Sequence, residues 1–203
     1  MEEIKIWNNS LSGKQAQEIA DRLEGGEIMI YPTDTLYAIG CDALNLKAIE
    51  KICRLMGIKT DKTNLSIICK DISQAAEYAR IDNSGFQLMR QYTPGPVTFI
   101  FRAASSLPRA FKGRKEVGVR IPDCPAPVQI VEALGHPILT TTVKFEDEDY
   151  TQNPELIAEH YENQPEIDFI LLGDDCETTP STIVDCTTST PTLIRPGRQP
   201  LDL

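Results

Sequence analysis

The sequence predicts an α/β protein built around a mixed sheet. Short apolar runs typical of strands alternate with segments of helical periodicity, and three strand-like runs then follow one another near the C-terminus. No internal repeat is present, and no linker is longer than a loop. Because 203 residues are enough to bury one core, we expect a single domain over residues 1–203.

The first elements have clear start and stop signals. Residues 3–7 form the first expected strand. Ser12, followed by Gln15 three residues later, has the capping-box spacing that begins a helix, and Gly25-Gly26 ends that helix. Residues 27–31 form the second expected strand.

The rest of the chain continues the alternation. Asn45 is placed to cap a helix from Leu46 to Met56, whose apolar residues fall on one face. Further helices are expected near residues 73–80, 83–91, 126–134 and 154–162. Strands are expected at residues 65–69, 93–101 (entered by a Pro/Gly corner), 117–121, 136–142, 169–173, 181–186 and 191–195.

The composition is that of an ordinary globular protein, with 41% hydrophobic and 25% charged residues. The chain has no run of 18 apolar residues and no charged-then-apolar leader, since its N-terminus MEEIKIW is acidic and mixed. We therefore expect a cytoplasmic protein with no membrane partner.

Six cysteines are scattered without C-x-x-C pairs, and the chain has only two histidines. This pattern argues against a structural zinc site. Several cysteines lie in strand-like runs such as SIIC, where a small buried side chain with a reduced thiol is expected.

The net charge of −10 is unevenly distributed. Residues 1–120 hold 17 Lys and Arg against 14 Asp and Glu, whereas residues 121–203 hold 3 against 16. The segment RAFKGRKE at residues 109–116 is the most basic stretch. It could steer an anionic ligand, or it could be a solvated charged loop.

Residues 31–43 read YPTDTLYAIGCDA, a strand end followed by a polar loop with three hydroxyls (Thr33, Thr35 and Tyr37) and one carboxylate (Asp34). Two interpretations are open. The loop could be a tight turn in which Asp34 and Thr35 bond the local backbone. It could also be one wall of a substrate pocket.

No glycine-rich phosphate loop follows any expected strand. Phosphates would therefore have to be held by side chains, and Arg120 is notable because it lies in the apolar run VGVRIP, where a charge is costly unless paired or facing a wet cavity. It could instead lie on the solvent face of the sheet with its stem packed flat. The other candidates are Arg54, Lys59, Lys62, Arg195, Thr140–Thr142, Ser181 and Thr182.

Five stretches occur in order over residues 29–197: YPTDTLYAIGCDA, TPGPVTFIF, VGVRIP, PSTIVD and LIRPG. Together they resemble the YrdC/YciO family, whose best-known members are L-threonylcarbamoyladenylate synthases. The resemblance implies a twisted sheet with a concave, often electropositive face. The chain is shorter than members with a second, C-terminal domain, so we expect the single-domain form.

The resemblance also implies a reaction. Threonine, bicarbonate and ATP would give threonylcarbamoyl-adenylate and pyrophosphate, the intermediate for N6-threonylcarbamoyladenosine in tRNA. Mg²⁺ would bind on the nucleotide rather than in a protein cage. Members of the family are also reported to bind double-stranded RNA or tRNA, which is the alternative function, with weak or no synthase activity.

Transferred residue by residue, the resemblance implies roles for the polar side chains. Thr33 and Tyr37 would contact the amino acid, with Asp34 and Thr35 supporting them. Arg120 would face a carboxylate or phosphate and, with Lys59, take part in catalysis. The remaining expected substrate-binding residues are Thr98, Arg54, Thr142, Ser181, Thr182 and Arg195.

Two stretches depart from the synthase pattern and resemble the YciO branch. A Lys-x-Arg-Pro-x-x-Lys-Pro-Leu-like stretch is replaced by CRLMGIKTDKTNLS, in which Arg54 stands for the first base and Met56 falls at the second. Lys59 and Lys62 are the candidate substitutes. A Ser-Ala-Asn sequence is replaced by residues 142–144, Thr-Val-Lys.

Overall fold

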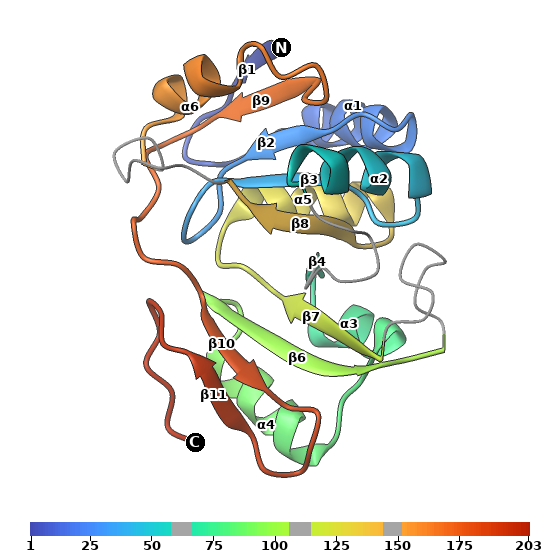
Figure 1. Cartoon of the computed structure of the whole chain (residues 1–203), viewed down its shortest axis with the longest axis vertical. Helices are drawn as coiled ribbons and strands as arrows, with labels where there is room; N and C mark the ends of the chain where they lie inside the picture. The colour runs from blue at the N-terminus through green and yellow to red at the C-terminus, as the bar shows by residue number, and fades with distance from the viewer. Residues whose placement is uncertain (58–65, 106–114, 144–151) are drawn as a thin grey trace.

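The computed structural model describes residues 1–57, 66–105, 115–143 and 152–203. Over this part of the chain a single mixed eleven-stranded sheet carries helices on its faces (Figure 1). The strands are β1 (Glu2–Lys5), β2 (Met29–Tyr31), β3 (Ala38–Asp42), β4 (Ser66–Ile68), β5 (Ala79–Arg80), β6 (Val97–Ala103), β7 (Glu116–Arg120), β8 (Ile138–Thr142), β9 (Phe169–Leu172), β10 (Thr182–Asp185) and β11 (Thr192–Arg195). The helices are α1 (Gly13–Glu24), α2 (Leu46–Leu55), α3 (Ile72–Tyr78), α4 (Asn83–Tyr92), α5 (Pro125–Leu134) and α6 (Pro154–Tyr161).

The strand order is β1-β9-β2-β3-β8-β4-β7-β6-β10-β11, and β5 pairs with β6. The pairs β1–β9, β9–β2, β4–β7 and β6–β10 are parallel, and the other pairs are antiparallel. Figure 1 shows the strand direction turning steadily from β9 and β2 to β6 and β11, which is the twist expected of L-amino-acid sheets. The mixed, twisted α/β sheet predicted from the sequence is confirmed.

The predicted helix signals are present. Ser12 Oγ accepts a hydrogen bond from Gln15 N at 3.3 Å, and Gln15 Oε1 accepts one from Ser12 N at 3.0 Å, so the capping box is complete. Gly26 adopts a φ of 91° just after α1. Asn45 Oδ1 accepts from Ala48 N at 3.2 Å and begins α2.

Three details differ from the sequence prediction. The end of the expected polar loop is strand β3, which is buried on both faces and therefore shows no alternation of polar and apolar residues. Its Gly40 weakens the strand signal, but a Cβ there would lie 2.7 Å from the Tyr31 ring. The helix expected at 73–80 begins at Ile72 and ends at Tyr78, where the chain enters the two-residue strand β5.

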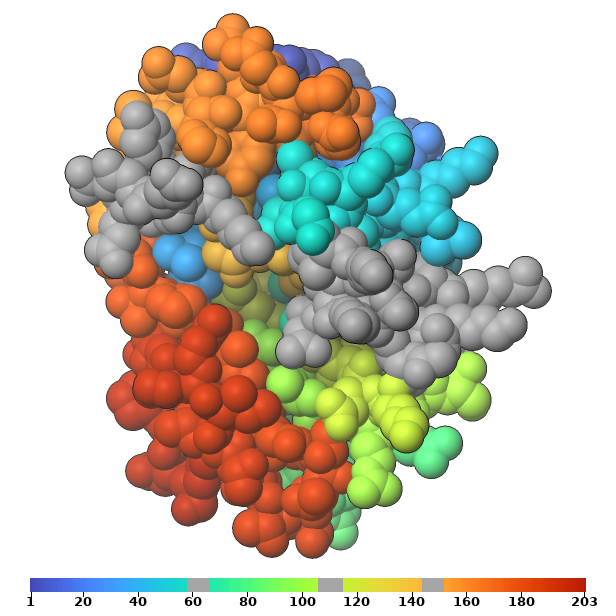
Figure 2. Space-filling view, viewed as in Figure 1, coloured from blue at the N-terminus to red at the C-terminus, as the bar shows by residue number. Residues whose placement is uncertain are grey.

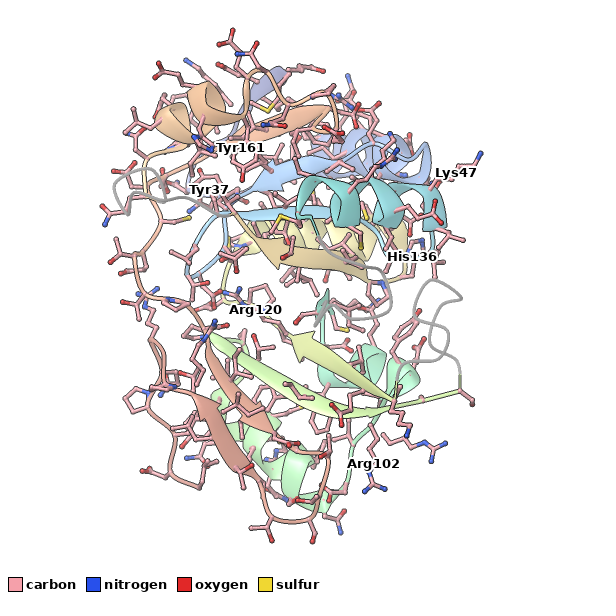
Figure 3. All side chains as sticks on the ribbon, viewed as in Figure 1. Tyr37, Lys47, Arg102, Arg120, His136 and Tyr161 are labelled. Carbon is pink, nitrogen blue, oxygen red and sulfur yellow. The ribbon has the colours of Figure 1, made fainter. Side chains whose placement is uncertain are left out.

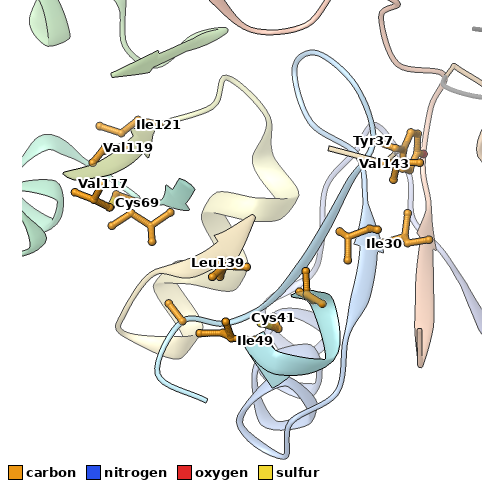
Figure 4. Packing of buried hydrophobic residues seen from close by; sticks show 14 of the residues in the cluster. Ile30, Tyr37, Cys41, Ile49, Cys69, Val117, Val119, Ile121, Leu139 and Val143 are labelled. Carbon is orange, nitrogen blue, oxygen red and sulfur yellow. The ribbon is translucent and has the colours of Figure 1, made fainter. Parts of the chain in front are cut away.

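Buried apolar side chains form one cluster on each face of the sheet. The first lies between the sheet and α2, α3, α4 and α6, and Figure 4 shows Ile30, Cys41 and Leu139 within it. The second lies between the sheet and the paired helices α1 and α5. All six cysteines are free thiols, and only Cys176 is partly exposed. None of the described helices has both the length and the apolar composition needed to cross a membrane.

Candidate active site

The polar loop joins β2 to β3, and one of its own hydroxyls closes it. Thr33 Oγ1 donates to the carbonyl of Leu36 at 2.7 Å and accepts from Thr35 N at 3.1 Å. The turn interpretation named Asp34 and Thr35 as the side chains that bond the local backbone. Among the described residues Thr33 has that role instead, whereas Thr35 Oγ1 lies 3.1 Å from Thr33 Oγ1 and the carboxylate of Asp34 binds other segments of the chain.

Arg120, at the end of β7, binds this loop from across the sheet. Its Nη2 lies 2.7 Å from Thr35 Oγ1 and 3.2 Å from Thr33 Oγ1, and it forms an ion pair with Asp34 Oδ1. Because Nη2 carries only two hydrogens, it cannot donate fully to all three oxygens at once. Asp34 Oδ2 is held in turn by the backbone N–H of Asp123 at 2.9 Å.

Arg120 is buried, with 7% of its surface exposed, so the alternative of an arginine lying flat on the solvent face is wrong. Its Nε is buried and has no hydrogen-bond partner among the described residues. A buried donor left without a partner costs about 1–3 kcal/mol. Such a cost is unusual beside an ion pair, because most buried donors in proteins have a partner.

Beside Arg120 lies a polar cavity of about 140 Å³. Its walls come from strands that are neighbours in the sheet, from β3 and β8 to β10 and β11. We call it the hydroxyl cavity, and its lining is Leu36, Ala38, Ser66, Thr98, Arg120, Thr140, Thr141, Thr142, Ser181, Ile183 and Arg195.

The hydroxyls of this cavity are ordered by pairs. Thr98 on β6 and Ser181 before β10 have their oxygens 2.9 Å apart, because β6 and β10 run parallel. Thr140 Oγ1 lies 2.6 Å from the hydroxyl of Tyr31, which is fully buried behind it. In each pair one hydroxyl donates to the oxygen of the other, so the hydroxyls of the cavity wall are held in fixed directions.

A second guanidinium closes the cavity on the β11 side. Arg195 Nη2 donates to the carbonyl of Ser181 at 2.7 Å and lies 3.4 Å from Ser181 Oγ. Burial lowers the pKa of Arg195, and the nearby charge of Arg120 lowers it further. Two guanidiniums close enough to repel each other favour an anion between them. No carboxylate is among the residues that line this cavity in the described part of the chain.

Several expected site residues are brought together here, and others are not. Thr98, Arg120, Thr142, Ser181 and Arg195 line the hydroxyl cavity, while Thr33, Asp34 and Thr35 reach it through Arg120. Thr182 lies beside it but is buried, and its hydroxyl donates to the carbonyl of Gln199.

Tyr37 is placed differently from the expectation that it contacts the amino acid. It is fully buried in the core, and in Figure 3 it lies above Arg120, on the side of β9. Its hydroxyl accepts from Gly173 N at 3.1 Å and donates to the carbonyl of Asp174 at 3.2 Å. Burial raises its pKa well above the usual range. Tyr37 therefore orders the end of β9 rather than a cavity wall.

The basic residues expected after α2 are only partly visible. Arg54 is exposed on α2 and does not line the hydroxyl cavity. Lys59 and Lys62 lie outside the described residues, as do Arg109, Lys112 and Arg114 of the basic stretch.

Three contributors were missed by sequence reasoning. Ser66 lines the hydroxyl cavity from the start of β4, opposite Gly118 of β7. Tyr31 supports Thr140 from behind. Arg198 donates to the carbonyl of Asp34 and forms a 2.8 Å ion pair with Glu177. For Arg198, the only signal in the sequence was the stretch LIRPGR, which has a second arginine three residues after Arg195. Figure 2 shows this C-terminal segment, in red, forming the lower part of the face on which α6, in orange, forms the upper part.

The fold defines a class of α/β proteins with a twisted mixed sheet and flanking helices, and the sequence identifies the family. The model of the Sua5/YciO/YrdC family, described as "Telomere recombination", matches residues 21–197. The chain belongs to this family. It is 36% identical to Escherichia coli K12 "Uncharacterized protein YciO" over 186 residues, which is 90% of this chain and 87% of that one. It is 31% identical to the "Threonylcarbamoyl-AMP synthase" of Shigella flexneri over 144 residues, 68% of this chain and 74% of that one.

Solved structures agree with this family. The crystal structure of E. coli YciO superposes with a TM-score of 0.87 at 32% identity and covers 97% of this chain and 96% of that one. A double variant of P. abyssi Sua5 superposes with a TM-score of 0.83 at 26% identity, covering 98% of this chain and 61% of that one.

Proposed function

We propose that this protein is a threonylcarbamoyl-AMP synthase that acts on threonine, bicarbonate and ATP. The observation that carries the proposal is a polar cavity lined by two arginines, Arg120 and Arg195, and by several hydroxyls, with no carboxylate among its described lining residues. The named relation to a threonylcarbamoyl-AMP synthase supplies the reaction. In this proposal an oxygen of the threonine carbamate attacks the α-phosphorus of ATP, a new P–O bond forms, and pyrophosphate leaves.

The residues of the hydroxyl cavity would act by position and charge. Arg120 would bind an anionic oxygen of the carbamate or the α-phosphate with its guanidinium, while Asp34 fixes the direction of that group. Thr98 and Ser181 would hold ribose or phosphate oxygens. No covalent nucleophile is required, because alignment and neutralisation of the developing charge lower the barrier.

Mg²⁺ is the metal that this reaction implies. The lining of the hydroxyl cavity described above offers hydroxyls and cations but no carboxylate, so these residues do not fit a protein-held magnesium site. We therefore expect the ion to arrive on the nucleotide phosphates, and no role of a protein residue depends on it.

The test is pyrophosphate release by the purified protein with ATP and bicarbonate, with and without threonine. We expect release only with threonine. Arg120→Lys should lower the rate by about 100-fold or more, by analogy with loss of one charge-stabilising donor. Arg102→Lys is the matched control, because Arg102 is exposed on β6 and Figure 3 shows it far from Arg120. Threonine-independent release, or equal rates for the two variants, would refute the proposal.

One observation favours a second candidate, a protein that binds nucleotide or RNA with weak or no synthase activity. Met56, at the position of the second expected base, is partly buried and packs against the core, so this position itself supplies no cation. Binding of ATP without threonine-dependent pyrophosphate release would favour this candidate. Binding of double-stranded RNA or tRNA should weaken linearly with log salt if phosphate contacts dominate.

A further inference from the structure

A second cavity, of about 440 Å³, opens at the carboxyl ends of β4 and β7. These two strands run parallel, and ligands of α/β sheets commonly bind beyond such strand ends. Its volume lies within the range of about 300–1,000 Å³ that is typical of small-molecule sites. We call it the apolar cavity. Its walls are Ile72, Pro94, Ile121, Pro122, Cys124, Pro125 and Val128, and its rim carries Lys70, Asp71, Thr93 and Asp123.

This cavity is separate from the hydroxyl cavity, although both are reached from the end of β7. Arg120 and Ile121 are consecutive, so their side chains point to opposite sides of the chain. Arg120 lines the hydroxyl cavity and Ile121 lines the apolar cavity. No residue lines both.

The wall segment 121–124 also holds the polar loop in place. The backbone N–H of Asp123 donates to Asp34 Oδ2 at 2.9 Å, and Cys124 Sγ donates to the carbonyl of Pro32 at 3.6 Å. A molecule that fills the apolar cavity contacts one side of this segment while the other side positions the carboxylate of Asp34, the partner of Arg120. The two sites are therefore linked through four consecutive residues.

The charges of the rim select a cation. The rim carries two carboxylates, Asp71 and Asp123, and one ammonium group, Lys70. Asp71 Oδ1 caps α3 by accepting from Gln74 N at 2.7 Å, and neither Lys70 nor Asp123 forms an ion pair with another described residue. The start of α5 does not attract an anion, although helix N-termini usually do. Pro125 and Pro127 have no N–H, and the N–H of Ala126 already donates to the carbonyl of Asn9 at 2.8 Å.

We propose that the apolar cavity is an effector site for a small amphipathic amine, with its apolar body against Ile72, Ile121 and Val128 and its ammonium group near Asp123. Occupancy shifts the segment 121–124 and, through Asp34, the position of the Arg120 guanidinium. This inference does not depend on the reaction proposed for the hydroxyl cavity.

The test uses two probes of the same shape, tryptamine and indole-3-propionate, added to the ¹⁵N-labelled full chain. Neither threonine nor ATP is present, so the outcome is independent of synthase activity. We expect tryptamine to shift the amide signals of Ile72, Ile121 and Val128, and to bind at least fivefold more tightly than indole-3-propionate. Equal or tighter binding of the carboxylate would overturn the assignment of a cation site. Tryptamine shifts confined to exposed residues elsewhere would overturn the site itself.

Variants separate binding from coupling. Val128→Trp fills the cavity and should abolish the tryptamine shifts. Glu132→Trp, which adds the same ring to the exposed face of the same helix, should leave them unchanged. Asp123→Asn should remove most of the preference for the amine while the backbone N–H to Asp34 remains. In the wild-type chain, tryptamine should also move the Nε–H signal of Arg120. If tryptamine binds and that signal stays in place, the coupling is wrong.

Discussion

Asp34→Asn removes the charge that faces Arg120 and changes little else in shape. Both side chains are buried, with 6% of Asp34 and 9% of Arg120 exposed. Leaving one member of a buried ion pair uncompensated typically costs about 3–5 kcal/mol. The hydroxyls of Thr33 and Thr35 can still accept from the guanidinium, so we expect the lower end of that range.

For a chain of this length, each 1 kcal/mol shifts the Tm by about 2–4 °C, so Asp34→Asn should lower it by about 6–12 °C. Thermal unfolding followed by circular dichroism measures this shift. Lys14→Ala is the comparison, because its ion pair with Glu18 is exposed and worth about 0.5 kcal/mol or less. A shift no larger than that of Lys14→Ala would refute the claim that the Arg120–Asp34 pair is structural.

A double-mutant cycle isolates the pair from other effects of each substitution. Arg120→Met alone leaves the carboxylate of Asp34 buried without its cation. Combined with Asp34→Asn, it removes both charges, so the double variant should be more stable than the sum of the single changes predicts. We expect a coupling free energy above about 1 kcal/mol, whereas independent sites add to within about 0.3–0.5 kcal/mol.

Three further predictions concern stability. Burial raises the pKa of Cys124 and Cys176 to about 12, while an unfolded thiol titrates near about 8.5. The folded state therefore favours the protonated thiol, so the free energy of unfolding is highest below about pH 8 and decreases as the pH rises further. A urea midpoint that stays constant from pH 7 to 10 would contradict this. Gly40→Ala should cost about 1–3 kcal/mol, because its Cβ would meet the Tyr31 ring, and urea unfolding should show this loss. Ser12→Ala should lower the free energy of unfolding by about 1 kcal/mol through loss of the α1 cap. Ser12→Asn, which keeps a capping side chain, should be as stable as the wild type and is the control.

Local signals in the sequence predicted most of the fold. The caps at Ser12 and Asn45 depend on neighbouring residues alone, and both appear in the structure where the sequence placed them. Strand β3 could not be predicted in the same way. Its two faces are covered by helices from opposite sides of the sheet, α2 on one side and α1 on the other, so no alternation marks it.

The candidate site was predicted only in part, because several of its contacts join residues that lie far apart in the chain. Arg120 was recognised because a charge in an apolar strand demands a partner, and Asp34 supplies it. The placement of Tyr37 could not be inferred, since a hydroxyl looks the same in a sequence whether it faces a ligand or the end of β9. Arg198 was missed because its partners, Asp34 and Glu177, are brought to it only by the path of the C-terminal segment.

That path determines when the site can form during synthesis. Arg120 precedes Arg195 by 75 positions, and the bond between Arg198 and Asp34 spans 164 positions. At about 5–20 residues per second, several seconds of translation separate the two arginines that line the hydroxyl cavity. Until β11 has been made, the cavity lacks both its wall on that side and its second guanidinium. If an anion binds between the two arginines, as proposed, affinity for it arises only after β11 has been added to the sheet.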